Sequence, residues 1–398
     1  MPHADSLVLF CRKGLTALLC SQVLIAPVAA APVPFETQAP IAYLVDLSSG
    51  AVLYARQADK RMLPASMAKM MTVYLAFKLI RQGTIKMTNN AIMRPEIWAK
   101  WSQAGSDSTM YIGAGERVSV ENLLHGITTV SGNDASEMLA EGIAGNQAAY
   151  VALMNRESIR LGLRDTRFGT VTGWPDAGRT WSTAHDLADL GRATLYDFPD
   201  YYRQFYGKPE FTWGHNIKTG KGISQPNRNP ILGRIAGADG IKTGHTAEAG
   251  FCLAGSAEQN GRRLIMIVAG LPSERDRASD SVALMDWGFK AWQNSPLVAA
   301  GKRVGAAKVQ LGSSATVGLI APRAVGITRP AGTNDAAKVS YSYNGPIRAP
   351  IAKGQHIADL VTIVAGLPPQ VTPLLAENDV PMGTFLGRVW AGFMSFFG

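Results

Sequence analysis

The sequence predicts a two-domain protein in which an α+β domain is followed by an all-β domain. The chain has 398 residues, which is enough for two domains of ordinary size. Strand-like runs flank a long helical section in the first part of the chain. Near Pro296 the composition changes to short alternating segments rich in Val, Ala, Gly and Thr. The apolar fraction of 46% is that of an ordinary globular protein.

Residues 1–30 have the features of an export leader. Arg12 and Lys13 precede an apolar run, Gly14–Val28, and small residues follow it. A charged start, an apolar run and a small-residue end are typical of a secretory signal peptide, and we expect cleavage after Ala30. An uncleaved anchor is the alternative, although the run is short for a membrane span.

The chain predicted to remain after cleavage holds one cysteine, and its charge is basic. Loss of the leader would remove Cys11 and Cys20, so Cys252 alone would remain and no internal disulfide could form. Cys252 lies in an apolar strand-like run, which is typical of a packed core residue rather than a nucleophile. The net charge of +9 is scattered along the chain, so it fits either a solvated surface or an acidic polymer nearby. We expect no nucleic-acid partner.

The first domain opens with a hairpin and a buried helix. Two strand-like runs, Ile41–Asp46 and Ala51–Tyr54, surround Ser48-Ser49-Gly50 and predict the hairpin. A helix over Met67–Ile80 follows, and Pro64 fixes the approach to it. Because this helix is apolar nearly all round, we expect it to be buried.

Further helices are predicted from apolar periodicity and from capping residues. They are Val120–Thr129; Ala135–Ile143, capped by Asp134; a helix that reaches Leu161, capped by Asn146; and Ala184–Leu195, opened by Ser182, Thr183 and Asp186 in a capping-box arrangement. Ser131-Gly132-Asn133 is therefore a tight link between two helices.

A strand pair and a long helix close the first domain. Ala249–Ser256 and Arg263–Ala269 are strand-like and are joined through Asn260-Gly261, and Asn-Gly is the strongest short hairpin signal. The helix Glu274–Trp292 follows. Later segments such as Thr316–Ile320 alternate with the period of a strand, which predicts the all-β second domain.

The last residues predict an amphipathic helix. Its apolar residues follow the helical period, and they are Phe385, Leu386, Val389, Trp390, Phe393, Met394, Phe396 and Phe397. The other side holds Gly387, Arg388, Ala391 and Ser395. At ~1.5 Å per residue the stretch 384–397 is roughly 21 Å long, which is short of the ~30 Å hydrocarbon core of a membrane. We therefore expect this helix to lie in the membrane interface, and a helix docked on the protein's own core is the alternative. The predicted segments are a signal peptide at 1–30, a catalytic domain at 36–295, a β-rich domain at 298–378 and an anchor helix at 384–398.

Three short motifs indicate chemistry. Ser66 and Lys69 are three residues apart, so they share one helix face. Ser131-Gly132-Asn133 links two helices, and Lys242-Thr243-Gly244 leads into the strand pair. Each motif is weak alone, but the three together, in this order, are specific. A second Lys-Thr-Gly at 218–220 is followed by a polar loop with a proline, so we favour the motif at 242–244.

The residue types of the first two motifs suit acyl transfer. A serine hydroxyl is nearly inert at neutral pH, so a nucleophilic Ser66 needs a base within reach. Lys69 could serve as that base if burial and a second cation lower the pKa of its amine. The Ser131 hydroxyl could relay a proton to a leaving amine, and the Asn133 amide could orient substrate or lysine.

The third motif suits a substrate that ends in a carboxylate. Lys242 supplies a positive charge and Thr243 a hydroxyl for that group. An oxyanion needs backbone N–H donors. Ser66 at a helix start supplies one such donor, and His245, which directly follows Gly244, could supply another.

These motifs and their contexts resemble the D-alanyl-D-alanine carboxypeptidases, which are serine-type, low-molecular-mass penicillin-binding proteins. The similarity covers roughly Ile41 to the C-terminus, and its motif contexts are Leu63–Lys69, Ser131–Ala135, Asn227–Asn229 and Asp239–Thr246. The resemblance implies an α/β (α+β) domain of the β-lactamase and penicillin-binding transpeptidase type, with an antiparallel sheet flanked by helices. Ser-Gly-Asn is this family's form of the middle motif, so it favours a carboxypeptidase over a β-lactamase.

The resemblance also implies roles for single residues. Ser66 would be the acylated nucleophile, Lys69 its base, and Ser131 part of the catalytic group. The implied substrate-binding residues are Asn133, Lys242, Thr243, Gly244, His245 and Arg228, with Arg228 near the substrate carboxylate and the Ser66 and His245 amides as oxyanion hole. One loop departs from the family pattern: Gly173 is kept, but Thr170 and Trp174 stand where the family usually has Asn and Leu.

The leading hypothesis is a D,D-carboxypeptidase that releases D-alanine from the pentapeptide stems of peptidoglycan and is inhibited covalently by β-lactams. A β-lactamase is one alternative, although no Glu-x-x-Leu-Asn segment supplies a deacylating carboxylate. A wall-binding module that is acylated without turnover is the other. We expect no cofactor and no metal, because the histidines show no metal-ligand spacing. The expected location is the periplasmic face of the cytoplasmic membrane, with the terminal helix on the membrane surface.

Overall fold

The structure is a computed structural model that describes residues 34–103, 108–216 and 218–384. The described chain forms two compact units. One comprises Phe35–Leu47 and Val52–Ala291, and the other includes Ser48–Ala51 and the residues from Trp292 onward. The predicted leader at 1–30 lies outside the described residues, as does the predicted anchor helix beyond Thr384.

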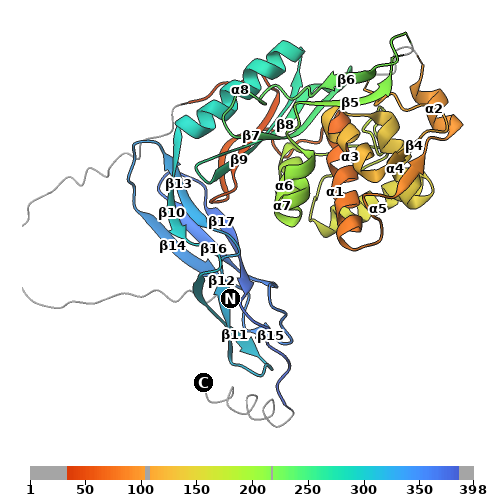
Figure 1. Ribbon diagram of the computed structural model, residues 1–398. Coiled ribbons are helices and arrows are strands. Elements are labelled where there is room, and N and C mark those ends of the chain that lie inside the picture. The colour runs from red at the N-terminus through yellow and green to blue at the C-terminus, as the bar shows by residue number, and fades with distance from the viewer. Residues whose placement is uncertain (1–33, 104–107, 217, 385–398) are drawn as a thin grey trace, which may run out of the picture. The chain divides into compact units, whose positions relative to one another are not determined.

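A five-stranded sheet with the order β2-β1-β9-β8-β7 supports the first unit (Figure 1). Its strands are β1 (Ile41–Asp46), β2 (Ala51–Arg56), β7 (Ala238–Thr246), β8 (Gly250–Gln259) and β9 (Arg262–Leu271). The pairs β1–β9, β9–β8 and β8–β7 are all antiparallel. The turn between β8 and β9 has positive φ angles of 52° at Asn260 and 76° at Gly261, as a tight hairpin requires, so the predicted hairpin is confirmed.

Helices cover both faces of this sheet, and two glycines let them approach closely. Successive strand residues point to opposite faces, so Leu264 and Ile265 on β9 face different layers. A Cβ atom on Gly288 of α8 would lie 2.9 Å from Leu264, whereas one on Gly191 of α6 would lie 3.3 Å from Ile265. The fold is therefore a layered α/β arrangement with an antiparallel sheet between helices, as the sequence predicts.

The helices of the first unit follow in chain order. They are α1 (Lys69–Arg81), α2 (Pro95–Trp101), α3 (Val120–Thr129), α4 (Asn133–Ala144), α5 (Gln147–Arg160), α6 (Ala184–Asp197), α7 (Pro199–Phe205) and α8 (Glu274–Lys290). Two short strand pairs accompany them: β3 (Asn90–Ile92) with β4 (Arg117–Ser119), and β5 (Glu210–His215) with β6 (Gly222–Pro226).

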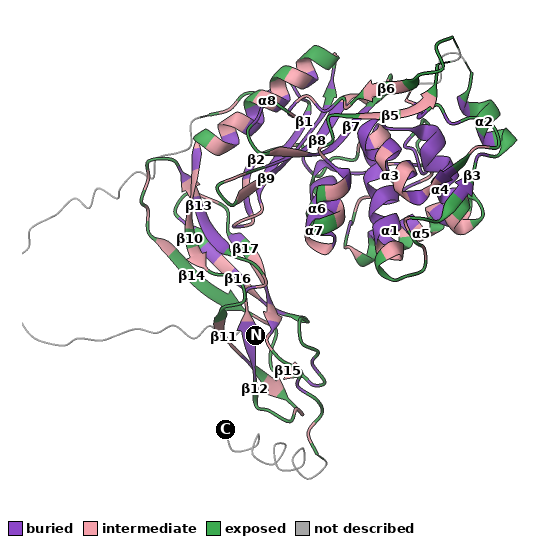
Figure 2. Ribbon diagram, viewed as in Figure 1, coloured by how far each residue is buried: buried purple, intermediate pink, exposed green. Residues whose placement is uncertain are grey.

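The helix α1 lies in the core, as its apolar sequence predicts. Every residue from Lys69 to Phe77 is buried (Figure 2). The start of this helix differs from the prediction, because Ala65–Ala68 form a single 3₁₀ turn and the α-helix begins at Lys69. A 3₁₀ turn at a helix start is common. Here Ser66 lies in the 3₁₀ turn, and Lys69 is the first residue of the α-helix.

Capping residues fix the starts of the following helices. The Asn146 side chain accepts a hydrogen bond from the Ala149 N–H (2.8 Å), and Thr183 accepts one from the Asp186 N–H (3.0 Å), as predicted. In a full capping box the Asp186 carboxylate would accept from the Thr183 N–H. Here it accepts from the Asp165 N–H instead (2.9 Å). The prediction that Asp134 caps a helix is wrong: it lies inside the first turn of α4, which begins one residue earlier.

The second unit is all-β, as predicted. Its strands are β10 (Trp292–Val298), β11 (Arg303–Gln310), β12 (Thr316–Ile320), β13 (Val325–Pro330), β14 (Ala337–Ser342), β15 (Ile347–Arg348), β16 (His356–Val364) and β17 (Gln370–Ala376). Six of them form a sheet with the order β14-β16-β17-β12-β11-β15, and β10 pairs with β13. The inward residues of this sheet, such as Leu319, Leu360 and Leu374, form a core of their own.

Two further features bear on the predictions. None of the helices within the described residues is long and apolar enough to cross a membrane. Cys252 is fully buried in β8, and burial raises the pKa of its thiol to about 11. A thiol in this environment stays protonated, which agrees with a packing role.

Candidate active site

The turn that carries Ser66 is held in an unusual backbone conformation. Ala65 has a positive φ of 47°, which is uncommon for a residue with a side chain. The Met67 N–H donates to the Pro64 carbonyl (3.0 Å), which closes the turn around Ser66. Ser66 itself is half-buried, so its hydroxyl is held in place by the turn and still open to a ligand.

Lys69 is the best-enclosed cation of this site. Its side chain is fully buried, and its Nζ lies 2.8 Å from Ser66 Oγ, 2.7 Å from Asn133 Oδ1 and 2.9 Å from the Thr172 carbonyl oxygen. Burial lowers the pKa of the Lys69 amine from its ordinary value to about 7, because a buried ammonium loses its hydration. At neutral pH a large share of Lys69 is therefore an uncharged amine beside the Ser66 hydroxyl.

The charges around Lys69 act in both directions. The Asp134 carboxylate favours the protonated amine and raises its pKa, whereas the Arg228 guanidinium lowers it. Asp134 is itself buried, and its carboxylate accepts from the backbone N–H groups of Met110 (2.8 Å) and Ile112 (3.3 Å). Burial raises the pKa of Asp134 while these hydrogen bonds lower it.

The link between α3 and α4 delivers the second motif to the same place. Ser131 has a positive φ of 64°, which turns the chain sharply. The Gly132 N–H donates back to the Gly126 carbonyl (3.0 Å), and the Asn133 N–H donates to the Ser108 carbonyl (2.8 Å). A Cβ atom on Gly132 would lie only 3.0 Å from the Asp134 carboxylate, so the middle position of the motif suits glycine.

The third motif lies on β7, the last strand of the five-stranded sheet. Lys242 is buried, and its Nζ donates to the Thr243 carbonyl (3.0 Å). Burial, with Lys69 and Arg228 next in effect, lowers the pKa of Lys242 well below its ordinary value. A Cβ atom on Gly244 would lie 2.8 Å from the Pro64 carbonyl oxygen, so glycine here lets β7 pack against the turn that carries Ser66.

Arg228 and Arg277 form a cationic group with Lys69 and Lys242. The exposed Arg228 donates to Ser108 Oγ (2.8 Å), and its carbonyl lies 3.4 Å from Nη2 of the buried Arg277. The charge of Arg277 also lowers the pKa of Lys242. Several cations held close together at one end of β7 are destabilised by one another, so an incoming carboxylate would relieve the repulsion between them.

His245 lies on the same strand as Lys242, whereas the second Lys-Thr-Gly lies elsewhere. His245 is exposed on β7, and its ring stacks on Phe251 with 3.9 Å between the ring centroids. The second Lys-Thr-Gly, at Lys218-Thr219-Gly220, is exposed and lies between β5 and β6 rather than beside Lys69.

In the part of the chain that the structure describes, no three His, Cys, Asp or Glu side chains form a metal-binding group.

The loop with the unusual sequence packs directly on the Ser66 turn. Gly173 has a φ of 72°, and a Cβ atom there would lie 1.8 Å from the Ala65 carbonyl oxygen. Thr170 Oγ1 accepts from the Gly173 N–H (2.9 Å), and this bond fixes the tight approach. Trp174 packs edge-on against Trp101, with 5.6 Å between ring centroids. Thr170 and Trp174 therefore shape the loop and its outer face.

Sequence patterns missed three contributors to this site. Thr172 acts through its backbone carbonyl, and no residue type marks such an acceptor. Arg277 comes from the first turn of α8, far along the chain, and carries no motif. The sequence shows Asp134 as a polar residue near a helix start. It does not show that Asp134 is buried or that its charge acts on Lys69.

Comparisons with known proteins cover both units. Residues 27–273 match the D-alanyl-D-alanine carboxypeptidase family, and residues 292–382 match the C-terminal domain of penicillin-binding protein 5. The chain is 36% identical over 350 residues to the D-alanyl-D-alanine carboxypeptidase DacC of Escherichia coli, covering 87% of this chain and 85% of the relative. It is 31% identical over 365 residues to DacF of Bacillus subtilis, covering 90% of this chain and 91% of that relative.

Solved structures that resemble this chain include penicillin-binding proteins. Penicillin-binding protein 5 from Haemophilus influenzae superposes with a TM-score of 0.72 at 34% identity, covering 88% of this chain and 100% of that chain. A penicillin-binding protein from Listeria monocytogenes in its ampicillin-bound form superposes with a TM-score of 0.55 at 30% identity, covering 65% of this chain and 100% of that chain.

Proposed function

The chain belongs to the D-alanyl-D-alanine carboxypeptidase family, and on that premise we propose that it removes the terminal D-alanine of peptidoglycan pentapeptide stems through an acyl-enzyme on Ser66. It is a serine-type hydrolase and a penicillin-binding protein. The observation that carries the assignment of Ser66 is the 2.8 Å contact between its hydroxyl and the buried Lys69 amine.

The surroundings of Lys69 orient it as a base. An ammonium donates three hydrogen bonds, and the three neighbours of Nζ can accept all of them. The uncharged amine keeps only two N–H groups. The Asn133 and Thr172 oxygens can only accept, so they take both, and the lone pair is left facing Ser66. In this state the Ser66 hydroxyl donates to Lys69, which is the arrangement that general-base catalysis needs.

Acylation then follows from this arrangement. Ser66 Oγ forms a bond to the carbonyl carbon between the two D-alanines, and its proton passes to Lys69 Nζ. The backbone N–H groups of Ser66 and His245 stabilise the oxyanion. The C–N bond breaks, and the proton reaches the leaving D-alanine amine through the Ser131 hydroxyl. Water next attacks the ester carbonyl and gives a proton to Lys69. The ester C–O bond then breaks, Lys69 returns that proton to Ser66 Oγ, and the shortened peptide leaves.

The cations at the other end of the site hold the substrate. The substrate's terminal carboxylate binds Lys242 and Thr243, with Arg228 nearby, and its negative charge restores the protonated form of Lys242. β-Lactams carry an equivalent carboxylate beside a strained amide, so they acylate the same serine. The Listeria relative named above is described as ampicillin-bound, which supports this part of the proposal.

The test is to label Ser66 with a fluorescent penicillin and to measure D-alanine release from a pentapeptide. We expect Ser66→Ala to abolish labelling and to lower D-alanine release by at least about 10³-fold. Retained labelling in Ser66→Ala would show that another nucleophile is acylated. Labelling without D-alanine release would indicate a non-turnover module, and rapid penicillin hydrolysis would indicate a β-lactamase.

We also propose a location for the protein. A leader over residues 1–30 would export the chain, and an amphipathic helix over 384–398 would hold it on the periplasmic face of the cytoplasmic membrane, where it would act in cell-wall synthesis. The charged start and apolar run of the leader support export. The aromatic-rich, helical-period pattern of the tail supports surface binding rather than spanning.

A further inference from the structure

Two exposed arginines stack on one tryptophan at the surface of the first unit. The Cζ atoms of Arg61 and Arg167 lie 5.4 Å and 5.5 Å from the centroid of the Trp181 ring. Arg167 and Trp181 also exchange two backbone hydrogen bonds, because the N–H of each donates to the carbonyl of the other (2.9 Å). Residues paired in this way point to the same face, so the backbone places Arg167 beside the ring. We call these three residues the Trp181 cluster.

Arg61 shows how an arginine of this cluster binds a carboxylate. Its Nε and Nη2 both donate to Oδ1 of Asp165, at 2.9 Å and 2.5 Å. Arg167 has the same guanidinium, but among the described residues its side chain forms no hydrogen bond or ion pair. All five of its N–H donors are therefore available to a ligand. Stacking on Trp181 restricts the side chain, so less conformational freedom is lost when a ligand binds.

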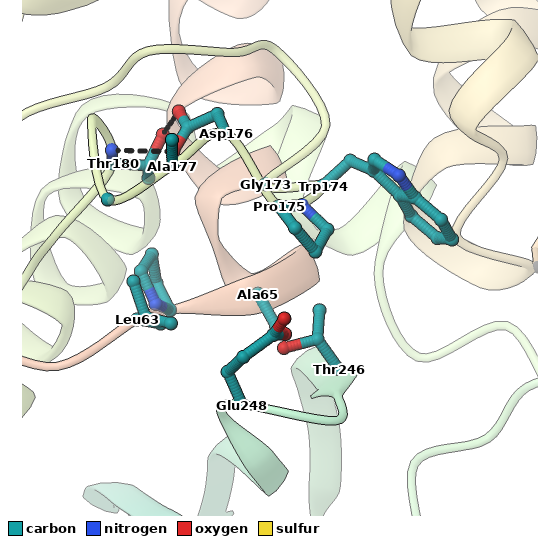
Figure 3. Close-up of a pocket in the computed structure, with 12 residues that line it drawn as sticks. Leu63, Ala65, Gly173, Trp174, Pro175, Asp176, Ala177, Thr180, Thr246 and Glu248 are labelled. Atoms are coloured by element: carbon teal, nitrogen blue, oxygen red, sulfur yellow. Dashed lines mark hydrogen bonds between the residues drawn. The ribbon is translucent and has the colours of Figure 1, made fainter.

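The segments that carry the cluster add further positive charge. Arg164 and Arg179 are both exposed and lie within three residues of Arg167 and Trp181 in the sequence. The nearby Asp176 carboxylate is already occupied, because it accepts from the N–H groups of Arg179 (2.9 Å) and Thr180 (3.1 Å) and from the Thr180 hydroxyl (2.6 Å). Figure 3 shows this carboxylate turned toward Thr180. A surface with this charge balance favours an anionic ligand.

The cluster lies next to the segments that flank the nucleophile. A cavity of about 160 Å³ beside the Ser66 turn is lined by residues that include Leu63 and Thr180 (Figure 3). Arg61 comes two residues before Leu63, and Trp181 directly follows Thr180. A polymer that presents one group to Ser66 therefore brings its neighbouring groups close to the cluster.

The proposed reaction identifies an anion that is abundant around Ser66. Each uncleaved stem peptide ends in a carboxylate, and hydrolysis of its last peptide bond leaves a new carboxylate on the shortened stem. A peptidoglycan polymer with many stems is thus polyanionic before and after the reaction. A guanidinium binds a carboxylate through two parallel hydrogen bonds, which gives geometric specificity as well as affinity. The same fork also suits the phosphate groups of an anionic lipid, so the experiments below distinguish the two.

We propose that the Trp181 cluster is a second binding surface for the peptidoglycan polymer, and that it holds carboxylates of neighbouring stem peptides while one stem occupies the Ser66 site. The surface rests on the proposed function, since it takes stem peptides as the substrate. Arg167 binds the carboxylate, and Trp181 positions its guanidinium. Two contacts on one polymer raise the effective concentration of stems at Ser66. A free pentapeptide cannot make both contacts, so its turnover does not depend on the cluster.

The first experiment measures cosedimentation with insoluble, lipid-free peptidoglycan, using the full chain with Ser66→Ala so that the polymer is not consumed. Loss of an exposed ion pair weakens affinity about two- to fivefold, and a reversed charge adds repulsion. We therefore expect Arg167→Glu to bind about three- to tenfold more weakly at low salt, with a smaller difference at high salt because exposed charges are screened. Arg117→Glu is the matched control, since Arg117 is an exposed arginine on β4 and the charge change is the same.

Two further ligands test the chemistry of this contact. On peptidoglycan whose carboxylates have been converted to amides, Arg167→Glu and the parent protein should bind equally. Vesicles that contain anionic phospholipid test the phosphate alternative. The proposal is overturned if Arg167→Glu weakens binding to the vesicles but not to peptidoglycan, if the difference persists on the amidated polymer, or if Arg117→Glu causes an equal loss.

The second experiment separates the surface from the proposed function by measuring D-alanine release in the Ser66 protein. With a soluble pentapeptide, we expect Arg167→Glu to keep the wild-type kcat/KM. With limiting peptidoglycan, its rate should fall about three- to tenfold, and Arg167→Lys should restore part of the loss because it keeps the charge without the fork. If the rate on peptidoglycan stays at the wild-type value, the surface is wrong while the Ser66 chemistry stands. If wild-type protein releases no D-alanine from the pentapeptide, the proposed function itself fails.

Discussion

Lys69 shows how burial turns an ordinarily protonated side chain into a base. Free lysine is almost fully charged at neutral pH, and here burial lowers the pKa to about 7. The Asn133 and Thr172 oxygens lie within hydrogen-bond distance of Nζ and can accept from either the ammonium or the uncharged amine. The side chain can therefore gain and lose a proton without losing its place, which is what repeated acylation and deacylation require.

The pH dependence of acylation tests this role. Only the uncharged amine can accept the Ser66 proton, so the rate of Ser66 acylation by benzylpenicillin should rise between about pH 6 and pH 8, with a midpoint near 7. Lys69→Arg should lower the rate at least about 10²-fold throughout, because a guanidinium stays charged. The measurement is the acylation rate at fixed penicillin concentration in each buffer. A rate that does not depend on pH, or that falls as pH rises, would contradict Lys69 as the base.

The spacing of residues in the sequence predicts which nearby side chains of this site meet, but it does not predict the groups that surround them. Ser66 and Lys69 are three positions apart, so any helical conformation brings them together. The Thr172 carbonyl that completes the Lys69 environment is 103 residues away along the chain. Its place depends on the tertiary fold of a loop, and no local pattern encodes that.

The loop from Thr170 to Thr180 links backbone conformation to the shape of the active site. Gly173 and Gly178 both have positive φ angles, 72° and 77°. They differ in surroundings, because a Cβ atom on Gly173 would meet the Ala65 carbonyl, whereas one on Gly178 would meet nothing within 4 Å. The loop therefore approaches the Ser66 turn at Gly173, where a side chain cannot fit.

This difference gives a prediction with its control in the same loop. Gly178→Ala should lower the free energy of unfolding by about 1 kcal/mol through the positive φ alone and leave acylation unchanged. Gly173→Ala carries the same backbone cost and must also displace the Ala65 turn, so penicillin acylation should fall at least about tenfold. Denaturant unfolding and the acylation rate measure the two effects. Equal acylation rates in the two variants would show that the loop does not position Ser66.

Whole elements were predictable where their signals are local. Asn260-Gly261, the Asn146 cap and the apolar run of α1 each set structure within a few residues, and each is found as expected. The 3₁₀ turn at Ala65–Ala68 was not predictable, because it depends on packing against β7 and the Gly173 loop.

At the scale of the molecule, composition located the second unit but not all of its parts. The change near Pro296 marks the all-β unit, yet that unit also includes Ser48–Ala51. The Ser49 hydroxyl lies 2.7 Å from the Thr328 hydroxyl, between residues 279 apart in sequence. Contacts between residues so far apart in the chain produce no periodic pattern in the sequence. Sequence position alone therefore assigns this turn to the first domain.

Membrane binding through residues 384–398 is testable on the exported chain. We expect the chain that lacks residues 1–30 to cosediment with vesicles, and a version ending at Thr384 to bind at least about tenfold more weakly. Trp390→Glu should weaken binding because the apolar side of the predicted helix enters the interface. Ser395→Glu is the control, since it adds the same charge on the other side. Equal loss in both variants, or none after truncation, would contradict interfacial binding.

The place of β7 at the end of the five-stranded sheet has a consequence of its own. An outermost strand carries backbone N–H and C=O groups that can pair with another chain, which makes such strands prone to unwanted association. Here the same strand carries Lys242, Thr243 and His245. A stem peptide lying along it would act as a temporary sixth strand, recognised first through its main chain. Catalysis and pairing of this edge strand would then depend on the same few hydrogen bonds.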